Sequence, residues 1–372
     1  MRKLLENMTS VVFFALLAVI MVCVIINGRH DFASMFRRQP ESDIHSECTE
    51  LLSDSLPLKR SWNELYSHTA RAFGKEELFG IYYEKTGDRL IDLNDCSTGS
   101  FTDESVNAVN RFHGAFPELP MFAMIIPTAS GIYRGRLPVQ SAAADQQKLI
   151  DDIYYNIDAE VTPLDVWSAL YSARDDYIYF RTDDRWTPQG AYCAYAATAA
   201  KLGLVPYSIS NYDVDYTHTE FRGELAEQSG IYDSVPDMIN VYRCKFGSYI
   251  KSCEVLRADG TLDKRSSVYS KSGLRSDDKY AYFLGTVHYK TVTVKTAAED
   301  EPKLLMIGSD YASCFLPFLA PHYSEILLAD PYEFAEGETL SELADVRGYD
   351  RVFMLIDVNS FCERGGLDAI CN

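Results

Sequence analysis

The length, composition and charge of the chain are those of a folded, acidic protein. Its 372 residues suffice for one large domain or two modest ones, and 47% of them are hydrophobic, which is ordinary for a protein with a core. The formal net charge of -19 argues against a nucleic-acid binder, because contacts to phosphate backbones need clustered Lys and Arg, and it argues equally against docking on anionic lipid.

The N-terminal segment has the pattern of a membrane anchor. Residues 11–26 contain no charged or strongly polar side chain, and with their flanks they are long enough to cross a bilayer. A cleaved signal peptide is the rival interpretation, but the run is followed by Asn27-Gly28-Arg29, a poor cleavage site. Positive residues lie on both sides, so the positive-inside rule does not orient the segment. We expect a signal anchor, a transmembrane helix, over residues 1–27 and a polar linker over 28–56.

Residues 57–372 show the alternating pattern of a single α/β domain. An amphipathic helix is predicted over 58–73 with a stop at Gly74, then a hairpin over 78–90 and a helix over 104–112. Short apolar runs that predict buried strands cover residues 121–126, 177–180, 304–307, 326–328 and 352–356, and helices are predicted over 142–157, 188–202 and 311–319.

This alternation of strands and helices predicts a mostly parallel sheet with helices on both faces. Residues 205–300 break the rhythm with short strand-like runs and turns, which predicts a β-rich insertion or lobe.

The nine cysteines show no metal-ligand spacing. Cys244 and Cys253 flank a turn-like stretch and are one candidate disulfide pair, and Cys362 and Cys371 are another, if the compartment is oxidising.

Two loops carry the candidate chemistry, because function in open α/β sheets gathers where strands end. The first runs from Phe180 to Pro188 and holds Asp183, Asp184, Arg185 and Trp186. The simpler interpretation is a capping loop with solvated charges, since Thr187 and Pro188 suit the start of a helix.

The second loop follows the predicted strand 304–307 and contains Gly308, Ser309, Asp310 and Tyr311. A nucleophile at the N-terminus of the next helix would have backbone N–H groups nearby to stabilise an oxyanion. The simpler interpretation is again a cap, with Ser309 or Asp310 accepting the first helical N–H groups.

At these loops the chain resembles the DHHW family, which is related to SGNH hydrolases and to proteins that acetylate polysaccharides at bacterial surfaces. The matching segments are Met124-Ile125-Ile126-Pro127-Thr128, Tyr177-Ile178-Tyr179-Phe180-Arg181-Thr182-Asp183, Trp186-Thr187-Pro188-Gln189-Gly190-Ala191-Tyr192, Tyr282-Phe283-Leu284-Gly285 and Pro317-Phe318-Leu319-Ala320-Pro321-His322-Tyr323. The resemblance implies an SGNH-like, flavodoxin-like fold, an extracytoplasmic location and a substrate groove that includes Trp186, Tyr311 and Gly285.

The chain departs from the family pattern where the chemistry is needed. Asp-His-His-Trp is replaced by Asp183-Asp184-Arg185-Trp186, so the expected general base falls on Arg185. Asp-Ser-Tyr-Ala is replaced by Ser309-Asp310-Tyr311-Ala312, so the expected nucleophile falls on Asp310. An expected asparagine falls on Val287, and only Asp183, which would orient the base, is retained.

These substitutions predict a disabled ester-transfer site. Arginine stays charged at ordinary pH and cannot take a proton from a serine. We expect an ion pair between Arg185 and Asp310 in place of the catalytic dyad, with independent drift of two loops as the plainer alternative. Catalysis by the neighbouring Ser309 would need a base such as His322 or His288.

A cation site made of Asp183, Asp184 and Asp310 is opposed by Arg185 in their midst, and no metal or cofactor is expected. The predicted function is a catalytically inactive SGNH-like domain at the outer side of the cell membrane, where it binds a polysaccharide or an envelope protein. The alternatives are an O-acetyltransferase or acetylesterase with a rearranged site, and a purely structural envelope protein.

Overall fold

The computed structural model describes residues 57–141, 143–246 and 249–371, together with parts of a helix between residues 11 and 26. The predicted linker over 28–56 and much of the predicted anchor therefore lie outside the described residues. In the described part of the chain, no helix is both long and apolar enough to cross a membrane. The chain divides into two compact units: the described residues up to 75, together with 229–231, form the smaller unit, and the remaining described residues form the larger one.

The smaller unit is built on helix α4 (Lys59–Ala72), which confirms the helix predicted there. Gly74 follows it with a φ of +86°, the left-handed conformation that ends many helices. Gly230, with a φ of +70°, lies so close to α4 that an added Cβ would be 2.5 Å from the carbonyl oxygen of Asn63.

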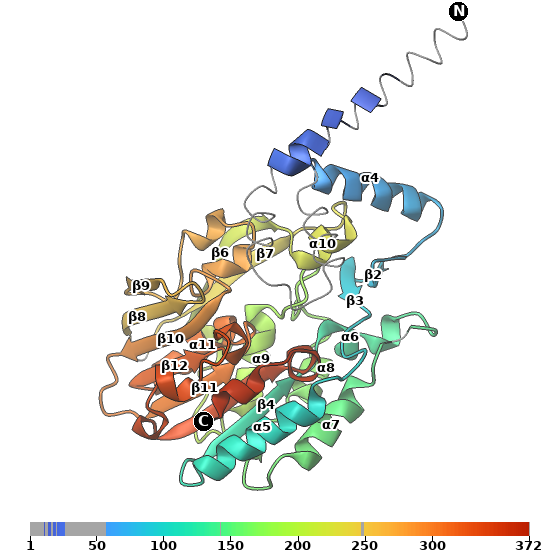
Figure 1. Ribbon diagram of the computed structural model, residues 1–372. Coiled ribbons are helices and arrows are strands. Elements are labelled where there is room, and N and C mark those ends of the chain that lie inside the picture. The colour runs from blue at the N-terminus through green and yellow to red at the C-terminus, as the bar shows by residue number, and fades with distance from the viewer. Residues whose placement is uncertain are drawn as a thin grey trace, which may run out of the picture. The chain divides into compact units, whose positions relative to one another are not determined.

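The larger unit is organised around an eight-stranded sheet with the order β5-β4-β13-β11-β12-β10-β8-β9 (Figure 1). Its strands are β4 (Met121–Ile126), β5 (Thr162–Pro163), β8 (Ile250–Arg257), β9 (Leu262–Arg265), β10 (Tyr289–Thr296), β11 (Lys303–Gly308), β12 (Glu325–Ala329) and β13 (Arg351–Asp357). The pairings from β5 to β12 are parallel, and those from β12 to β9 are antiparallel. The mainly parallel sheet predicted from the alternating pattern is therefore present.

Helices cover both faces of this sheet because alternate residues of its central strands point to opposite sides. Met306 belongs to one buried core with α8 (Trp167–Ser172), α9 (Pro188–Thr198) and α11 (Ala312–Leu319). Ile307 belongs to the other core with α5 (Thr102–Ala115), α7 (Gln146–Asn156) and α13 (Val358–Glu363).

Smaller elements complete the larger unit. An antiparallel sheet is formed by β1 (Glu77–Leu78), β2 (Ile81–Glu84) and β3 (Arg89–Asp92), which confirms the predicted hairpin. A second antiparallel pair is formed by β6 (Tyr212–Phe221) and β7 (Asp237–Cys244). The remaining helices are α6 (Ala129–Ile132), α10 (Glu224–Ser229) and α12 (Leu340–Leu343). Short 3-10 helices are η1 (Arg134–Arg136), η2 (Ile209–Asn211), η3 (Gly273–Arg275), η4 (Lys279–Tyr282), η5 (Ala320–His322), η6 (Pro331–Glu333), η7 (Val346–Gly348) and η8 (Leu367–Ile370).

One predicted strand is wrong. Residues 177–180 do not join the sheet, and their only ladder contact is an isolated antiparallel bridge between Tyr179 and Trp186. The local turn satisfies this backbone instead, since Phe180 N–H donates to the Arg185 carbonyl (3.2 Å) and Thr187 N–H to the Ile178 carbonyl (2.9 Å).

The β-rich region 205–300 extends the main sheet as well as adding the separate pair β6–β7. Strands β8, β9 and β10 all come from this region and form the antiparallel edge of the eight-stranded sheet. The same hydrophobic pattern would also suit a separate lobe, so only the pairing of β10 with β12 reveals the common sheet.

Neither predicted cysteine pair is present, and every described cysteine is a free thiol. Cys244 lies on β7 and Cys253 on β8, which belong to different sheets. The Cys371 thiol contacts the Ala108 carbonyl at 3.3 Å, away from Cys362. Short sequence separation did not predict contact here because the two cysteines of each candidate pair lie on different elements that pack against different partners.

Candidate functional site

The loop over residues 181–187 is held in place by a buried carboxylate from β7. Asp237 accepts hydrogen bonds from the backbone N–H groups of Arg181 and Thr182, each at 2.7 Å, and from the Thr182 hydroxyl at 2.5 Å. At the other end of the loop, Thr187 caps α9 and accepts from Gly190 N–H at 3.3 Å. The loop therefore has a fixed conformation that directs the side chains of Asp183 and Arg185 inward.

Arg185 lies among four carboxylates: it donates hydrogen bonds to three of them, and its Nε lies 3.9 Å from Oδ1 of the fourth, Asp184. Its guanidinium donates to both oxygens of Asp183, with Nε–Oδ1 2.6 Å and Nη2–Oδ2 2.7 Å. It also donates from Nη2 to Asp278 (2.9 Å) and from Nη1 to Asp310 (3.3 Å), and it lies 4.1 Å from the Tyr280 ring centroid. The expected ion pair between Arg185 and Asp310 is thus present, within a larger group that we call the Arg185 cluster: Arg185, Asp183, Asp278 and Asp310.

Burial makes the electrostatics of this cluster strong. The side chains of Arg185 and Asp183 are 4% and 0% exposed. Burial by itself raises the pKa of Asp183, but the bidentate Arg185 outweighs it and holds that pKa below the usual range. The same carboxylates raise the pKa of Arg185 against the effect of its burial. The arginine therefore stays charged and cannot act as a general base.

Asp310 is less tightly held. Enclosure raises its pKa to about 6 although 29% of its side chain is exposed, and Arg185 opposes the rise. Asp310 lies in the short turn between β11 and α11, the place expected for a nucleophile. A carboxylate at this position has no hydroxyl proton to lose, so the chemistry of an attacking serine is not available to it.

Ser309 points away from the Arg185 cluster. It is 0% exposed, and its hydroxyl donates to Asp357 at the end of β13 (2.8 Å). His322, one possible base for it, shares a hydrogen bond with the Tyr195 hydroxyl (2.8 Å), and the other, His288, lies 3.3 Å from Glu333. The structure therefore does not bring Ser309 together with either histidine.

Trp186 and Tyr311 hold the two loops together instead of facing solvent. Trp186 is 0% exposed, donates from its indole nitrogen to the Tyr311 carbonyl (2.9 Å) and stacks on Phe315. The Tyr311 hydroxyl donates to the Asp184 carbonyl (2.6 Å). Neither ring offers a face to a ligand in this structure, so a positioning role is the one their contacts support.

Gly285 marks a close approach of side chain to backbone. Its φ is +77°, and an added Cβ would lie 2.2 Å from Nη1 of Arg265. Its carbonyl accepts a hydrogen bond from Arg257 (3.2 Å). This is a structural reason for glycine at the position, alongside the substrate contact implied by the family resemblance.

Sequence reasoning missed three carboxylates of the site. Asp278 caps η4 just before the matched segment 282–285. Asp357 ends a correctly predicted strand, so a search for acidic residues at strand ends would have found it. Asp237 begins a strand in the irregular region and carried no signal of its contact with the loop.

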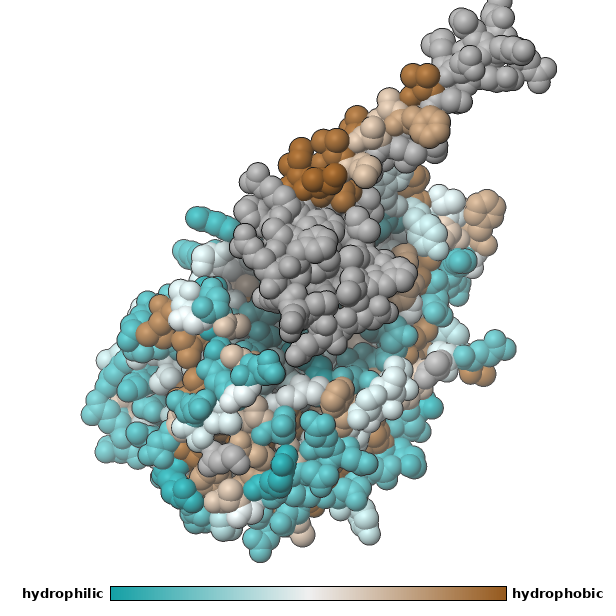
Figure 2. All heavy atoms as spheres, in the orientation of Figure 1, coloured by the Kyte–Doolittle hydropathy of each residue, from teal (hydrophilic) through white to brown (hydrophobic). Residues whose placement is uncertain are grey.

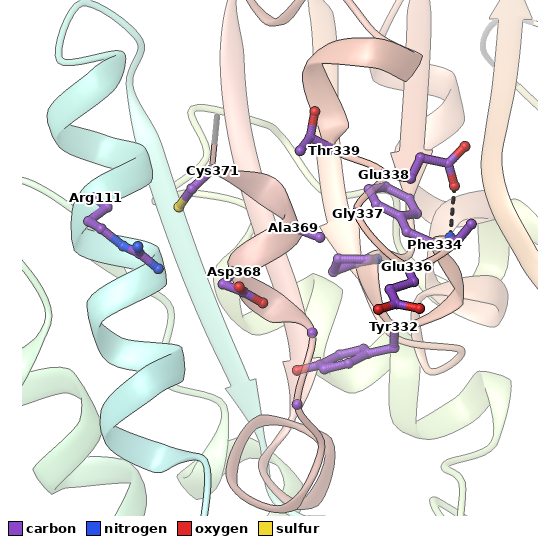
Figure 3. A pocket seen from close by; sticks show the side chains of 14 residues that line it. Arg111, Tyr332, Phe334, Glu336, Gly337, Glu338, Thr339, Asp368, Ala369 and Cys371 are labelled. Atoms are coloured by element: carbon purple, nitrogen blue, oxygen red, sulfur yellow. Dashed lines mark hydrogen bonds between the residues drawn. The ribbon is translucent and has the colours of Figure 1, made fainter. Parts of the chain in front are cut away.

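Two surface hollows lie on the larger unit. A groove of about 790 Å³ lies beside α6, η1 and α8, and its polar and aromatic lining includes Arg134, Asp145, Trp167 and Tyr171. A second hollow of about 470 Å³ is lined by Arg111 on α5, by Asp368 and Cys371 near the C-terminus, and by the segment 334–339, where Glu338 accepts from Ala335 N–H (Figure 3). The first hollow is lined in part by Gly131 and Ile132 of α6, the helix that follows the C-terminal end of β4.

The fold and this polar cluster define a mixed α/β protein with a large, mainly parallel sheet and a substituted site at the strand ends. Residues 65–329 match the sequence profile of the family described as DHHW protein. The chain belongs to the DHHW family, which confirms the resemblance seen in its motifs.

Solved structures of two proteins share this fold at low sequence identity. A DHHW family protein from Eubacterium siraeum has a TM-score of 0.61 and 21% identity, with 74% of this chain and 88% of that chain covered. Bacillus cereus PatB1 with a sulfonyl adduct has a TM-score of 0.64 and 14% identity, covering 78% of this chain and 98% of that one. The O-acetyltransferase domain of Pseudomonas putida AlgJ is also similar, with a TM-score of 0.46, 14% identity and coverage of 77% and 93%. A comparison with curated proteins finds no match.

Proposed function

We propose that this chain is a catalytically inactive DHHW domain, held at the outer side of the cell membrane by its N-terminal segment, that binds a cell-surface polysaccharide. The observation that carries the proposal is the Arg185 cluster. An arginine, bound to three carboxylates, stands where the family has its general base, and a carboxylate stands where it has its nucleophile.

The chemistry of acyl transfer needs a proton acceptor that titrates near neutral pH and a hydroxyl that attacks. Arg185 provides neither, and its bonds to Asp183 occupy the carboxylate that would orient a histidine. The nearest hydroxyl in sequence, that of Ser309, is bound to Asp357. The general base and the attacking hydroxyl are thus replaced, and the orienting carboxylate and the neighbouring serine are bound to other groups.

Binding of a polar polymer is supported by the larger unit's surface. On the face shown in Figure 2, hydrophilic residues predominate over its described part and hydrophobic ones form small scattered areas. The groove beside α8 combines the half-exposed ring of Tyr171 with Trp167, Arg134 and Asp145, a mixture of ring faces and polar groups that suits a sugar chain. An envelope protein as the ligand is the competing outcome.

Acetyl-ester hydrolysis tests the catalytic half of the proposal. We would assay the purified chain with p-nitrophenyl acetate beside Arg185→His/Asp310→Ser, which restores the family residues, and Arg185→His/Asp310→Ala, which restores the base alone. We expect no turnover by the natural chain and by the alanine variant, whichever rate the serine variant reaches. Turnover by the natural chain that is lost in Ser309→Ala would instead establish the alternative, an acetylesterase or O-acetyltransferase with a rearranged site.

Cosedimentation with insoluble envelope polysaccharide tests the binding half. Tyr171→Ala is expected to weaken binding, because it removes an exposed ring from the groove. Glu336→Ala, in the second hollow, is the matched control and is expected to bind like the natural chain. Equal binding by all three proteins would show that the polysaccharide binds outside the groove. No binding by the natural chain would favour an envelope protein as the partner.

A further inference from the structure

Two buried cysteines from distant parts of the chain belong to the same hydrophobic core of the larger unit. Cys96 lies in the loop after β3 and Cys362 lies in α13, and they are 6% and 0% exposed. Both side chains pack into the same buried hydrophobic core, and each thiol shifts the pKa of the other, as neighbouring groups do.

The backbones around this pair are fixed by further hydrogen bonds. Cys96 N–H donates to the Asn359 side chain (2.9 Å), and Phe101 N–H donates to the Cys362 carbonyl (2.9 Å). Glu363 accepts from the N–H groups of Thr98 (2.7 Å) and Gly99 (2.8 Å). Hydrogen bonds therefore hold the loop and the helix side by side around the two cysteines, the arrangement that a disulfide between them requires.

We propose that Cys96 and Cys362 form a disulfide when the chain folds in an oxidising compartment. The proposal rests on the extracytoplasmic placement in the proposed function for its occurrence in the cell, but its geometry can be tested without it. Disulfides persist outside the cytoplasm and are rare within it.

The reaction needs an external disulfide as oxidant, such as oxidised glutathione or a disulfide-exchange protein. The Cys362 thiolate attacks one sulfur of that disulfide, which forms a mixed disulfide and releases one thiol. Cys96, after loss of its proton, then attacks the Cys362 sulfur and releases the second thiol, so two protein thiols lose two electrons and two protons and the oxidant gains them. The neighbouring Cys96 thiol lowers the pKa of Cys362, which favours Cys362 as the first nucleophile.

The cross-link would fasten a polar network that supports the groove beside α8. Asp95, next to Cys96, accepts hydrogen bonds from Thr128 (2.5 Å) and Ser130 (2.9 Å). These two residues stand at the start of α6, and Gly131 and Ile132 of that helix line the groove. A disulfide between Cys96 and Cys362 would therefore connect the loop that supports α6, and with it the wall of the groove, to helix α13.

The test is to refold the full chain with a mixture of reduced and oxidised glutathione, because both sulfurs are buried in the folded state. Tryptic digestion without reductant should join the peptide of residues 90–111 to that of residues 352–364, each of which contains a single cysteine. We expect this linked peptide in the natural chain and in Cys244→Ser, and its absence in Cys96→Ser and Cys362→Ser. The oxidised natural chain should melt at least about 5 °C above its reduced form, a difference that Cys96→Ser lacks.

Folded protein with free thiols at both positions after oxidative refolding, or linkage of either cysteine to another one, would overturn the proposal. The same peptide map on protein taken directly from cells then tests location. A disulfide formed with glutathione but absent in cells would count against the extracytoplasmic placement and leave the geometry of the pair intact.

Discussion

Replacement of Arg185 by methionine should destabilise the larger unit strongly. Methionine keeps much of the side-chain volume but removes the hydrogen bonds to Asp183, Asp278 and Asp310. Asp183, at 0% exposure, is then left as a buried carboxylate without a cation, although the Arg185 and Glu224 N–H groups still donate to it at 3.2 and 3.3 Å. Breaking such a buried pair costs about 3–5 kcal/mol, and the remaining N–H donors place the expected loss near the lower value.

Urea unfolding followed by circular dichroism measures this loss, and a melting temperature lower by about 6–12 °C should accompany it. The loss should shrink as the pH falls towards 4, because protonation removes the unpaired charge of Asp183. Asp310→Asn is the matched control: it removes the negative charge from one 3.3 Å contact of a side chain that is 29% exposed, while the amide oxygen can still accept from Arg185, so the expected cost is below about 1 kcal/mol. An unfolding free energy for Arg185→Met within about 1 kcal/mol of the natural chain, or a loss independent of pH, would refute the reasoning.

Three further predictions concern groups around the site. Burial raises the pKa of Asp95 to about 7, so the folded state holds a proton that the unfolded state releases near pH 4. The free energy of unfolding should therefore fall by up to about 4 kcal/mol as the pH rises from 4 to 7. Asp95→Asn should lose that part of the pH dependence in urea titrations. An unchanged pH slope in the variant would contradict this. Trp186→Phe removes the 2.9 Å bond to the Tyr311 carbonyl and should cost about 1–3 kcal/mol in the same assay, whereas an unchanged midpoint would mean that the two loops do not depend on it. Ser309→Ala removes the buried 2.8 Å bond to Asp357 and should cost about 1 kcal/mol; a large change in any esterase rate, without loss of stability, would return Ser309 to the chemistry.

The sequence by itself determined the elements whose signals are local. Strands β4, β11, β12 and β13 were predicted because buried strands need continuous apolar runs, and helices α9 and α11 because their starts follow capping or strand-end residues. The family and its two altered motifs were also readable, since Asp-His-His-Trp and Asp-Ser-Tyr-Ala are each contained within four residues. The pairing of Arg185 with Asp310 followed from the positions that the family brings together.

Only the tertiary structure decided which distant groups meet. Asp278 contacts Arg185 across 93 positions of the sequence, and no local pattern announces such a contact. The burial of Trp186 follows from packing against α11, and the proximity of Cys96 to Cys362 follows from α13 packing beside the loop after β3. Residues 177–180 have the composition of a strand, but the backbone N–H groups that follow them, those of Arg181 and Thr182, donate to the Asp237 carboxylate and not to a neighbouring strand. Tertiary contacts therefore outweigh local strand propensity there.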